Sequence, residues 1–182
     1  SIFFYKLLFN RFSNYGVSLI GTLFFVLSPR IYGSSFFNNK DIVFLSLLTI
    51  ALYYCFKALE KPNFKNFLIF SVFAALGVSL RVFGIFLPIF FIIFYLLPFL
   101  SNNKNLNNLF NLIFFFIFFF VFLILFWPFL WSSPFENFVS ALQHFSDHPA
   151  RMKMLFFGEY IDSDFLPYHY IFTWIFISTP TL

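Results

Sequence analysis

The stretch FLIFSVFAALGVSLRVFGIFLPIFFIIFYLLPFL, residues 67–100, decides which kind of fold this chain can adopt. As a single α-helix it would extend about 50 Å at 1.5 Å per residue, whereas the hydrocarbon core of a bilayer is about 30 Å thick. Near its middle lie Arg81, Gly84 and Pro88, which are a charge, a flexible residue and a helix breaker. We therefore predict two helices joined by a tight reversal at one membrane face.

The whole chain shares the apolar character of this stretch. Of its 182 residues, 61% are hydrophobic and 10% are charged, with 38 Phe and a mean hydropathy of +0.88. A soluble protein carries roughly 25% charged residues, so this chain has too few to cover a surface in water. The composition excludes disorder, a coiled coil and a nucleic-acid module, and predicts an all-α, polytopic transmembrane bundle.

The apolar runs predict six spans in one domain that covers residues 1–182. A span of about 20 apolar residues crosses the core, and shorter ones suffice where protein shields their ends. We place the spans at residues 12–28, 42–56, 67–80, 82–100, 109–131 and 166–182. Residues 2–9 are expected to be the end of a further span.

The charges divide between two sets of loops, because successive loops lie on opposite membrane faces. The first set holds six basic residues and one acidic residue, namely Lys6, Arg11, Lys57, Lys61, Lys65 and Lys104 with Glu60. The second set holds five basic residues and six of the seven acidic residues. Cationic loops stay in the cytoplasm, so we place the second set, with its long loop 132–165, outside it. The net charge of +4 reflects this loop distribution and indicates no nucleic-acid partner.

The loop PRIYGSSFFNNKD, residues 29–41, is the most informative polar segment. Asp41 stands at the start of the next helix, where a carboxylate serves as N-terminal cap and dipole partner. Helix capping explains Asp41 but not the presence of Arg30 and Lys40, which lie on either side of small residues at a membrane face. Arg81 is expected on the same face, either as a functional charge or with its side chain extended to the interface. Such a cluster suits a phosphate or a divalent cation.

The loop 132–165 should contain a surface amphipathic helix. It follows two Trp in WPFLW, residues 127–131, which are typical of a membrane interface. Pro134 and Glu136 after Ser133 are typical of a helix start, and the apolar stripe consists of Phe135, Phe138, Val139, Leu142 and Phe145. We expect this helix to lie flat on the membrane.

The polar side of that helix raises the question of a metal site. His144 and His148 are four residues apart, with Asp147 beside them. Two His at this spacing can share a metal, but a zinc site needs further ligands that the sequence does not identify. We assign no metal here and expect a solvated side instead.

Residues 158–170, GEYIDSDFLPYHY, are the last polar segment. Its carboxylates could bind a cation or sugar hydroxyls, although an acidic solvated loop is the simpler interpretation. Its aromatic residues could stack on a sugar or anchor the chain at the interface. The candidate contacts to sugar or acceptor are Glu159, Asp162, Tyr168, His169 and Tyr170.

Together these segments resemble bacterial members of the dolichyl-phosphate-mannose protein mannosyltransferase superfamily, related to the lipid A aminoarabinose transferases. The resemblance runs from about Phe12 to Leu182 through PRIYGSSFFNNKD, LGVSLRVFGIFLP, WPFLW and GEYIDSDFLPYHY…TWIFISTP. It implies the core of a GT-C fold and transfer of a sugar from a polyprenyl-phosphate donor to a protein, lipid or glycan. The expected place is the non-cytoplasmic side of a bacterial cytoplasmic membrane, among membrane lipids, in the context of cell-envelope or protein glycosylation.

The resemblance also implies roles for individual residues. Arg30, Lys40 and Arg81 would bind the donor phosphate, and Asp41 would match an acidic residue of the second extracytoplasmic loop, on the metal or acceptor side. Some relatives use a divalent cation. The family's catalytic base lies in the first extracytoplasmic loop, which we expect before Ser1, so we expect this piece of the protein to be inactive alone. The resemblance does not identify the sugar or the acceptor.

Two other classes of protein remain open at this point. A multi-span transporter would also have short spans and an intramembrane Arg, but it should show repeated halves with broken helices. A non-catalytic membrane assembly subunit would tolerate replacement of Arg30, Asp41 and Arg81.

Overall fold

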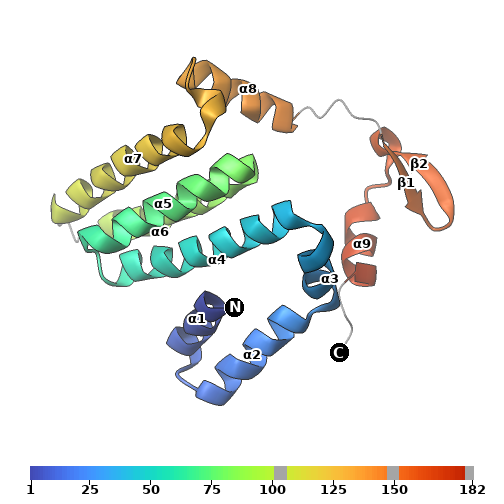
Figure 1. The fold of residues 1–182 in the computed structure, drawn as a ribbon, viewed down its shortest axis with the longest axis horizontal. Helices are drawn as coiled ribbons and strands as arrows, with labels where there is room; N and C mark the ends of the chain where they lie inside the picture. The colour runs from blue at the N-terminus through green and yellow to red at the C-terminus, as the bar shows by residue number, and fades with distance from the viewer. Residues whose placement is uncertain (101–105, 147–151, 179–182) are drawn as a thin grey trace. The chain divides into compact units, whose positions relative to one another are not determined.

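The computed structural model describes residues 1–100, 106–146 and 152–178, and these are mostly helical, as predicted (Figure 1). The chain divides into two compact units, Ser1–Leu142 and Gln143–Leu182. The helices of the first unit are α1 (Ile2–Phe12), α2 (Tyr15–Leu27), α3 (Pro29–Phe37), α4 (Asn39–Glu60), α5 (Phe64–Leu80), α6 (Phe86–Leu100) and α7 (Leu106–Phe126), with 3-10 helices η1 (Val82–Ile85) and η2 (Pro128–Leu130). Helix α8 (Pro134–Ser146) begins in this unit.

The core of the first unit lies between α4, α5, α6 and α7. Figure 1 shows α4, α5 and α7 side by side, with α6 behind α5. Phe70, Phe91 and Phe115 are fully buried, and their ring centroids lie 4.8 to 5.0 Å apart. The abundant Phe therefore holds this unit together through ring-to-ring packing, which stabilises beyond the buried area alone.

The chain reverses at Arg81, where the sequence predicts a break. Helix α5 ends at Leu80, Arg81 is extended with φ −142°, and η1 leads into α6. Gly84 is buried against α5, so a Cβ there would lie 2.9 Å from the carbonyl carbon of Gly77. Its role is close backbone approach rather than the flexibility that we expected. Pro88 lies within the first turn of α6, where proline is tolerated, so the reversal is complete before it.

The segment predicted as the loop 29–41 is largely helical. Helix α3 starts with Pro29 at its first position, and its axis is bent by 52° from that of α2. Proline favours a helix start because its φ is fixed and its missing N–H costs nothing there. The serines of this segment favour a loop by composition, and that preference is overridden.

The described residues contain one helix, α4, that is long and apolar enough to cross a membrane by itself. Helices α2 and α3 meet the same criterion as a bent pair, and the apolar helices Phe64–Leu80, Val82–Leu96 and Phe110–Phe126 are shorter. The polytopic bundle and its six spans stay a prediction.

The amphipathic helix and the last polar segment have different outcomes. Helix α8 starts at Pro134, as predicted, and its Phe138 packs on Trp127 with centroids 6.2 Å apart.

In the second unit, β1 (Lys153–Phe156) and β2 (Glu159–Asp162) form an antiparallel hairpin before η3 (Ser163–Phe165) and α9 (Tyr170–Ser178). This hairpin was not predicted from the sequence, and it lies in the predicted loop 132–165 of an otherwise mostly helical chain. The two residues of the turn, Phe157 and Gly158, have φ of 50° and 88°, the signs that a tight hairpin requires.

Candidate functional site

The junction between α3 and α4 places Asp41 through a side-chain cap. The Asp41 backbone N–H donates to Asn38 Oδ1 over 3.0 Å, and Asn38 Nδ2 donates to Asp41 Oδ2 over 2.7 Å. Asn38 is therefore the N-cap of α4, not Asp41 as predicted, and Asp41 lies in the first turn. A carboxylate in that turn also interacts favourably with the helix dipole.

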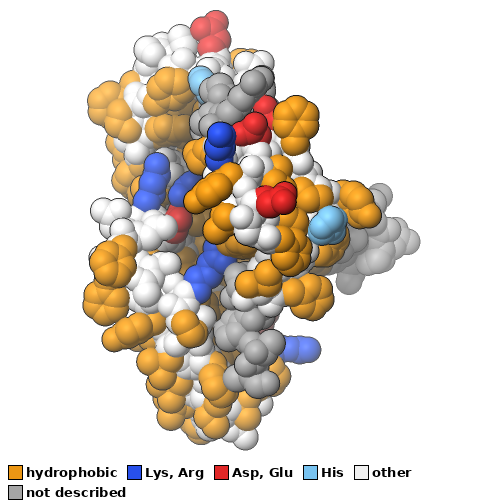
Figure 2. Space-filling view, turned by 90° about the vertical axis from the view of Figure 1, so that its right-hand side faces the viewer, with side chains coloured by type: hydrophobic (Ala, Val, Ile, Leu, Met, Phe, Trp, Pro, Cys, Tyr) orange, Lys and Arg blue, Asp and Glu red, His pale blue; other side chains and the backbone are white. Residues whose placement is uncertain are grey.

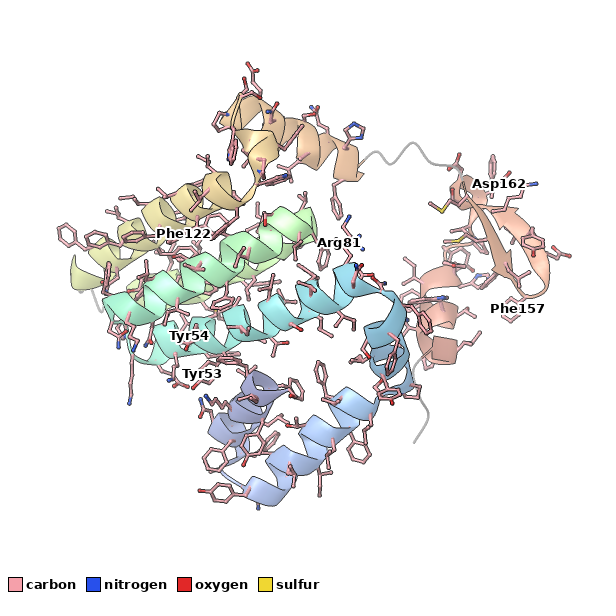
Figure 3. The ribbon with its side chains drawn as sticks, viewed as in Figure 1. Tyr53, Tyr54, Arg81, Phe122, Phe157 and Asp162 are labelled. Atoms are coloured by element: carbon pink, nitrogen blue, oxygen red, sulfur yellow. The ribbon has the colours of Figure 1, made fainter. Side chains whose placement is uncertain are left out.

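Arg81 forms an ion pair with Asp41, although the two residues are forty positions apart. The reversal after α5 brings Arg81 to the N-terminal end of α4 (Figure 3). Both side chains are about half exposed, at 45% and 48%. The pair is thus accessible, and in water its own contribution to stability is small.

The surroundings of Asp41 favour its charged form. Asp41 lies just outside the predicted span 42–56, which begins at Ile42. A hydrogen bond from Asn38 lowers the pKa of Asp41 below its usual 3.8, and Arg81 and Lys40 lower this pKa further. The carboxylate is therefore ionised at neutral pH.

Arg30 of α3 lies in the same part of the fold as Asp41. A pocket of about 310 Å³ between α3 and α4 has Arg30, Ser34, Asn38 and Asp41 on its wall. We call Arg30, Lys40, Asp41 and Arg81 the charged cluster. It combines three cations with one carboxylate, so the structure brings together the four residues singled out in the first half of the sequence. Figure 2 shows how sparse charged side chains are on the face it displays, among many hydrophobic ones.

An apolar pocket of about 370 Å³ adjoins the charged cluster. It lies among α1, α2, α3 and α4, and its walls are Ser1, Phe3, Phe25, Val26, Ile31, Tyr32, Ser35, Ile42, Leu45, Ser46, Thr49 and Ile50. Ile31, Ile42 and Leu45 belong to the walls of both pockets. A single molecule with an anionic head and an apolar tail would match this pair of pockets.

The candidate residues of the last polar segment belong to the second unit. Glu159 and Asp162 are exposed residues of β2, paired with Phe156 and Lys153 of β1. Tyr168 is exposed at 94%. Their predicted contacts with sugar or acceptor stay predictions.

Two aromatic residues of this segment pack against the hairpin. The rings of His169 and Tyr170 lie 5.7 Å and 5.1 Å from the ring of Phe156, measured between centroids. Tyr170 also lines an aromatic pocket of about 180 Å³ with Leu155, Phe156, Phe157, Trp174 and Ile177. A stacking role is therefore compatible with the position of Tyr170.

The charged cluster does not fit a divalent cation. Asp41 is its one carboxylate, and that carboxylate already accepts from Asn38 and Arg81. Divalent cations need several oxygen ligands and are repelled by neighbouring cations. Within the described ranges, no group of three or more His, Cys, Asp and Glu could hold a metal. Asp147 and His148 lie outside those ranges.

Sequence reasoning missed two features of this site. The capping residue Asn38 could have been found from its position three residues before Asp41, a spacing typical of an N-cap. The shared wall of the two pockets had no such signal, because it depends on the bend between α2 and α3.

Comparison with known proteins gives one finding for this chain. The family described as dolichyl-phosphate-mannose-protein mannosyltransferase matches residues 1–131, a range that includes the whole charged cluster. No curated protein and no solved structure matches the chain.

Proposed function

The chain belongs to the dolichyl-phosphate-mannose-protein mannosyltransferase family, and on this premise we propose that its charged cluster binds the phosphate of a polyprenyl-phosphate-linked sugar. The family consists of membrane glycosyltransferases of the GT-C type, which use donors of this class. The proposed reaction transfers the sugar to a protein, lipid or glycan on the non-cytoplasmic face of a bacterial cytoplasmic membrane. The proposed protein crosses that membrane several times.

The observation that carries the proposal is the shared wall of the charged and apolar pockets. A polyprenyl phosphate has an anionic head joined directly to a long apolar tail. The pocket at Arg30 and Asp41 suits the head, and the neighbouring pocket of about 370 Å³ suits the first isoprene units of the tail. Ile31, Ile42 and Leu45 belong to the walls of both pockets, so head and tail sites lie next to each other.

Arginine at two positions gives the cluster its phosphate chemistry. A guanidinium presents several N–H donors in a plane and binds phosphate oxygens in pairs, more strongly than neutral donors do. Arg30 and Arg81 come from α3 and from the end of α5, so they can approach one phosphate from two elements. Lys40, exposed in the first turn of α4, adds positive charge.

The same charges would assist the chemical step. In the transfer, an acceptor hydroxyl gives its proton to a base and forms a bond to the anomeric carbon of the sugar, and the bond from that carbon to the phosphate oxygen breaks. The leaving phosphate gains negative charge, which nearby arginines stabilise. The charged cluster thus serves the leaving-group side of the reaction.

Asp41 acts in this proposal as a positioning residue. It is held by Asn38 and in turn pairs with the guanidinium of Arg81, while Asp41 itself lines the pocket. When the donor phosphate binds, Arg81 can share its donors between the carboxylate and the phosphate. Asp41 therefore orients Arg81 without touching the sugar.

Photo-crosslinking of a labelled polyprenyl-phosphate sugar to the full-length protein in membranes tests this proposal. Arg30→Gln and Arg81→Gln should each reduce labelling at least about tenfold, because a hydrogen bond to a charged group contributes about 1.5–3 kcal/mol. Lys65→Gln, which removes an exposed charge at the start of α5, is the matched control and should label normally. Equal labelling of all variants would contradict the assignment and favour a non-catalytic subunit.

A further inference from the structure

A second group of charged and aromatic residues lies at the other end of α4. It consists of Phe3 and Lys6 of α1 together with Tyr53, Tyr54 and Lys57 of α4, and we call it the tyrosine–lysine cluster. Figure 3 shows Tyr53 and Tyr54 toward the end of α4 that is far from Arg81. At 1.5 Å per residue, Tyr53 is about 18 Å along the helix from Asp41. The two clusters are therefore distinct sites on one helix.

Both lysines of this cluster lie over the ring of Tyr53. Lys57 Nζ is 5.0 Å from the ring centroid, and Lys6 Nζ is 6.0 Å from it and 5.2 Å from the centroid of Phe3. An ammonium group within about 6 Å of an aromatic face is attracted by the electrons of the ring. The rings thus hold two cations near each other, although like charges repel.

The aromatic part of the cluster is a packed platform. The Tyr53 ring centroid lies 5.5 Å from that of Phe3 and 5.2 Å from that of Tyr54, both in edge-to-face geometry. Tyr53 is 7% exposed, whereas Lys57 is half-buried and Lys6 is exposed. The platform is therefore fixed in the fold, and its cations face outward from it.

The surroundings of the two lysines carry more positive than negative charge, and Glu60 at the end of α4 is the carboxylate that acts on Lys57. Lys61 directly follows α4 and Lys65 lies at the start of α5. Asn66 fixes the turn between these helices by donating from Nδ2 to the carbonyl oxygens of Lys57 and Lys61, over 3.3 and 3.0 Å. In the described part of the chain, neither Lys6 nor Lys57 lies within ion-pair distance of a carboxylate. Their positive charge is available to an external anion.

We propose that the tyrosine–lysine cluster binds the anionic phosphate headgroup of a phospholipid at the membrane face opposite the charged cluster. Tyrosines lie preferentially at the headgroup level of a bilayer, and lysines there attract anionic lipids. Ammonium groups also form strong hydrogen bonds to phosphate oxygens. The proposal rests on the membrane placement in the proposed function, but not on the identity of the donor.

The test uses the full-length protein in lipid nanodiscs of phosphatidylcholine with increasing phosphatidylglycerol. Retention of phosphatidylglycerol is measured by native mass spectrometry after the protein is released from the nanodiscs. Lys6→Gln with Lys57→Gln should weaken retention about 100-fold, because a hydrogen bond from each ammonium group to the charged phosphate contributes about 1.5 kcal/mol or more, or about tenfold. Lys61→Gln with Lys65→Gln removes the same charge beside the cluster and is expected to weaken retention less than about threefold. Lys6→Arg with Lys57→Arg keeps the charge and should retain the lipid.

Three results would overturn the proposal. Equal losses in the two Gln pairs would mean general attraction of anionic lipid to a basic surface. Unchanged retention in the Lys6 and Lys57 pair would mean that the cluster binds no lipid. Displacement of the lipid by inorganic phosphate at a similar concentration would mean a site for soluble phosphate. In each case crosslinking of the labelled donor is measured on the same samples, so failure here is distinguishable from failure of the proposed function.

Discussion

Replacement of Gly84 by Ala should destabilise the first unit, because the reversal between α5 and α6 leaves no room for a side chain. A Cβ at this position would lie 2.9 Å from the carbonyl carbon of Gly77, 3.0 Å from the nitrogen of Val78 and 3.1 Å from the oxygen of Gly77. All three are backbone atoms of α5, so they cannot move aside as a flexible side chain would. Overpacking of this kind costs about 1–3 kcal/mol.

The assay for Gly84→Ala is thermal unfolding of the purified protein in detergent. For a chain of this size about 1 kcal/mol corresponds to about 2–4 °C, so the midpoint should fall by about 2–12 °C. Because η1 follows Arg81 directly, the same variant should also weaken crosslinking of the labelled donor.

Gly33→Ala is the matched control for this prediction. A Cβ at Gly33 would meet nothing within 4 Å, and Ala favours helix over Gly by about 0.5–1 kcal/mol. Its midpoint should stay unchanged or rise. A Gly84→Ala midpoint equal to that of the unaltered protein would refute the close packing of η1 on α5.

Three further predictions concern other parts of the fold. Asn66→Leu should lower the free energy of unfolding by about 1–3 kcal/mol, measured by denaturant titration, because the carbonyl oxygens of Lys57 and Lys61 lose the side-chain amide that donates to both; an unchanged value would rule out this role. Gly158→Ala should raise amide hydrogen exchange in β1 and β2, since φ of 88° is strained for any other residue, and unchanged exchange would contradict the turn geometry. Because the pKa of Asp41 is lowered by folding, the stability that it contributes is present above its usual 3.8 and is lost as pH falls through the folded value. The difference in unfolding midpoint between Asp41→Asn and the unaltered protein should therefore be constant from about pH 5 to about pH 8 and shrink in more acidic solution, and a change near neutrality would contradict the ionised state.

The helices of the first unit follow from composition and breaker residues. The long apolar stretch 67–100 had to break, and Arg81 marked the place because a charge and two nearby breakers interrupt the apolar run. What the sequence did not reveal was why Gly84 is required, since close approach of two backbones depends on how η1 packs on α5. The local sequence pattern thus predicts where a helix begins and ends, whereas side-chain and backbone packing decides which other helices it contacts.

The loops were harder to predict than the helices. Ser, Gly and Asn in the segment 29–41 favour turns, yet Pro29 starts a helix there and Asn38 starts the next. The hairpin at residues 153–162 was missed because its strands are short and its turn holds Phe157 beside Gly158, rather than the Asn-Gly or Asp-Gly pair that usually marks such a turn.

The charged cluster was identified from residue type, and its geometry came from the fold. Sequence singled out Arg30, Lys40, Asp41 and Arg81 because charges are rare and costly among apolar spans. Only the reversal after α5 shows that Arg81 meets Asp41 across forty positions. The tyrosine–lysine cluster had no sequence signal, because Lys6 and Tyr53 meet through packing of α1 on α4.

Sugar transfer from a polyprenyl-phosphate donor, measured in membranes that contain the full-length protein, is the decisive test of the charged cluster as a phosphate site. Arg81→Ala and Asp41→Ala are compared with Lys65→Ala at matched expression. Both variants of the charged cluster should lose transfer, while Lys65→Ala should keep it. Transfer at the unaltered rate in both Arg81→Ala and Asp41→Ala would contradict this assignment.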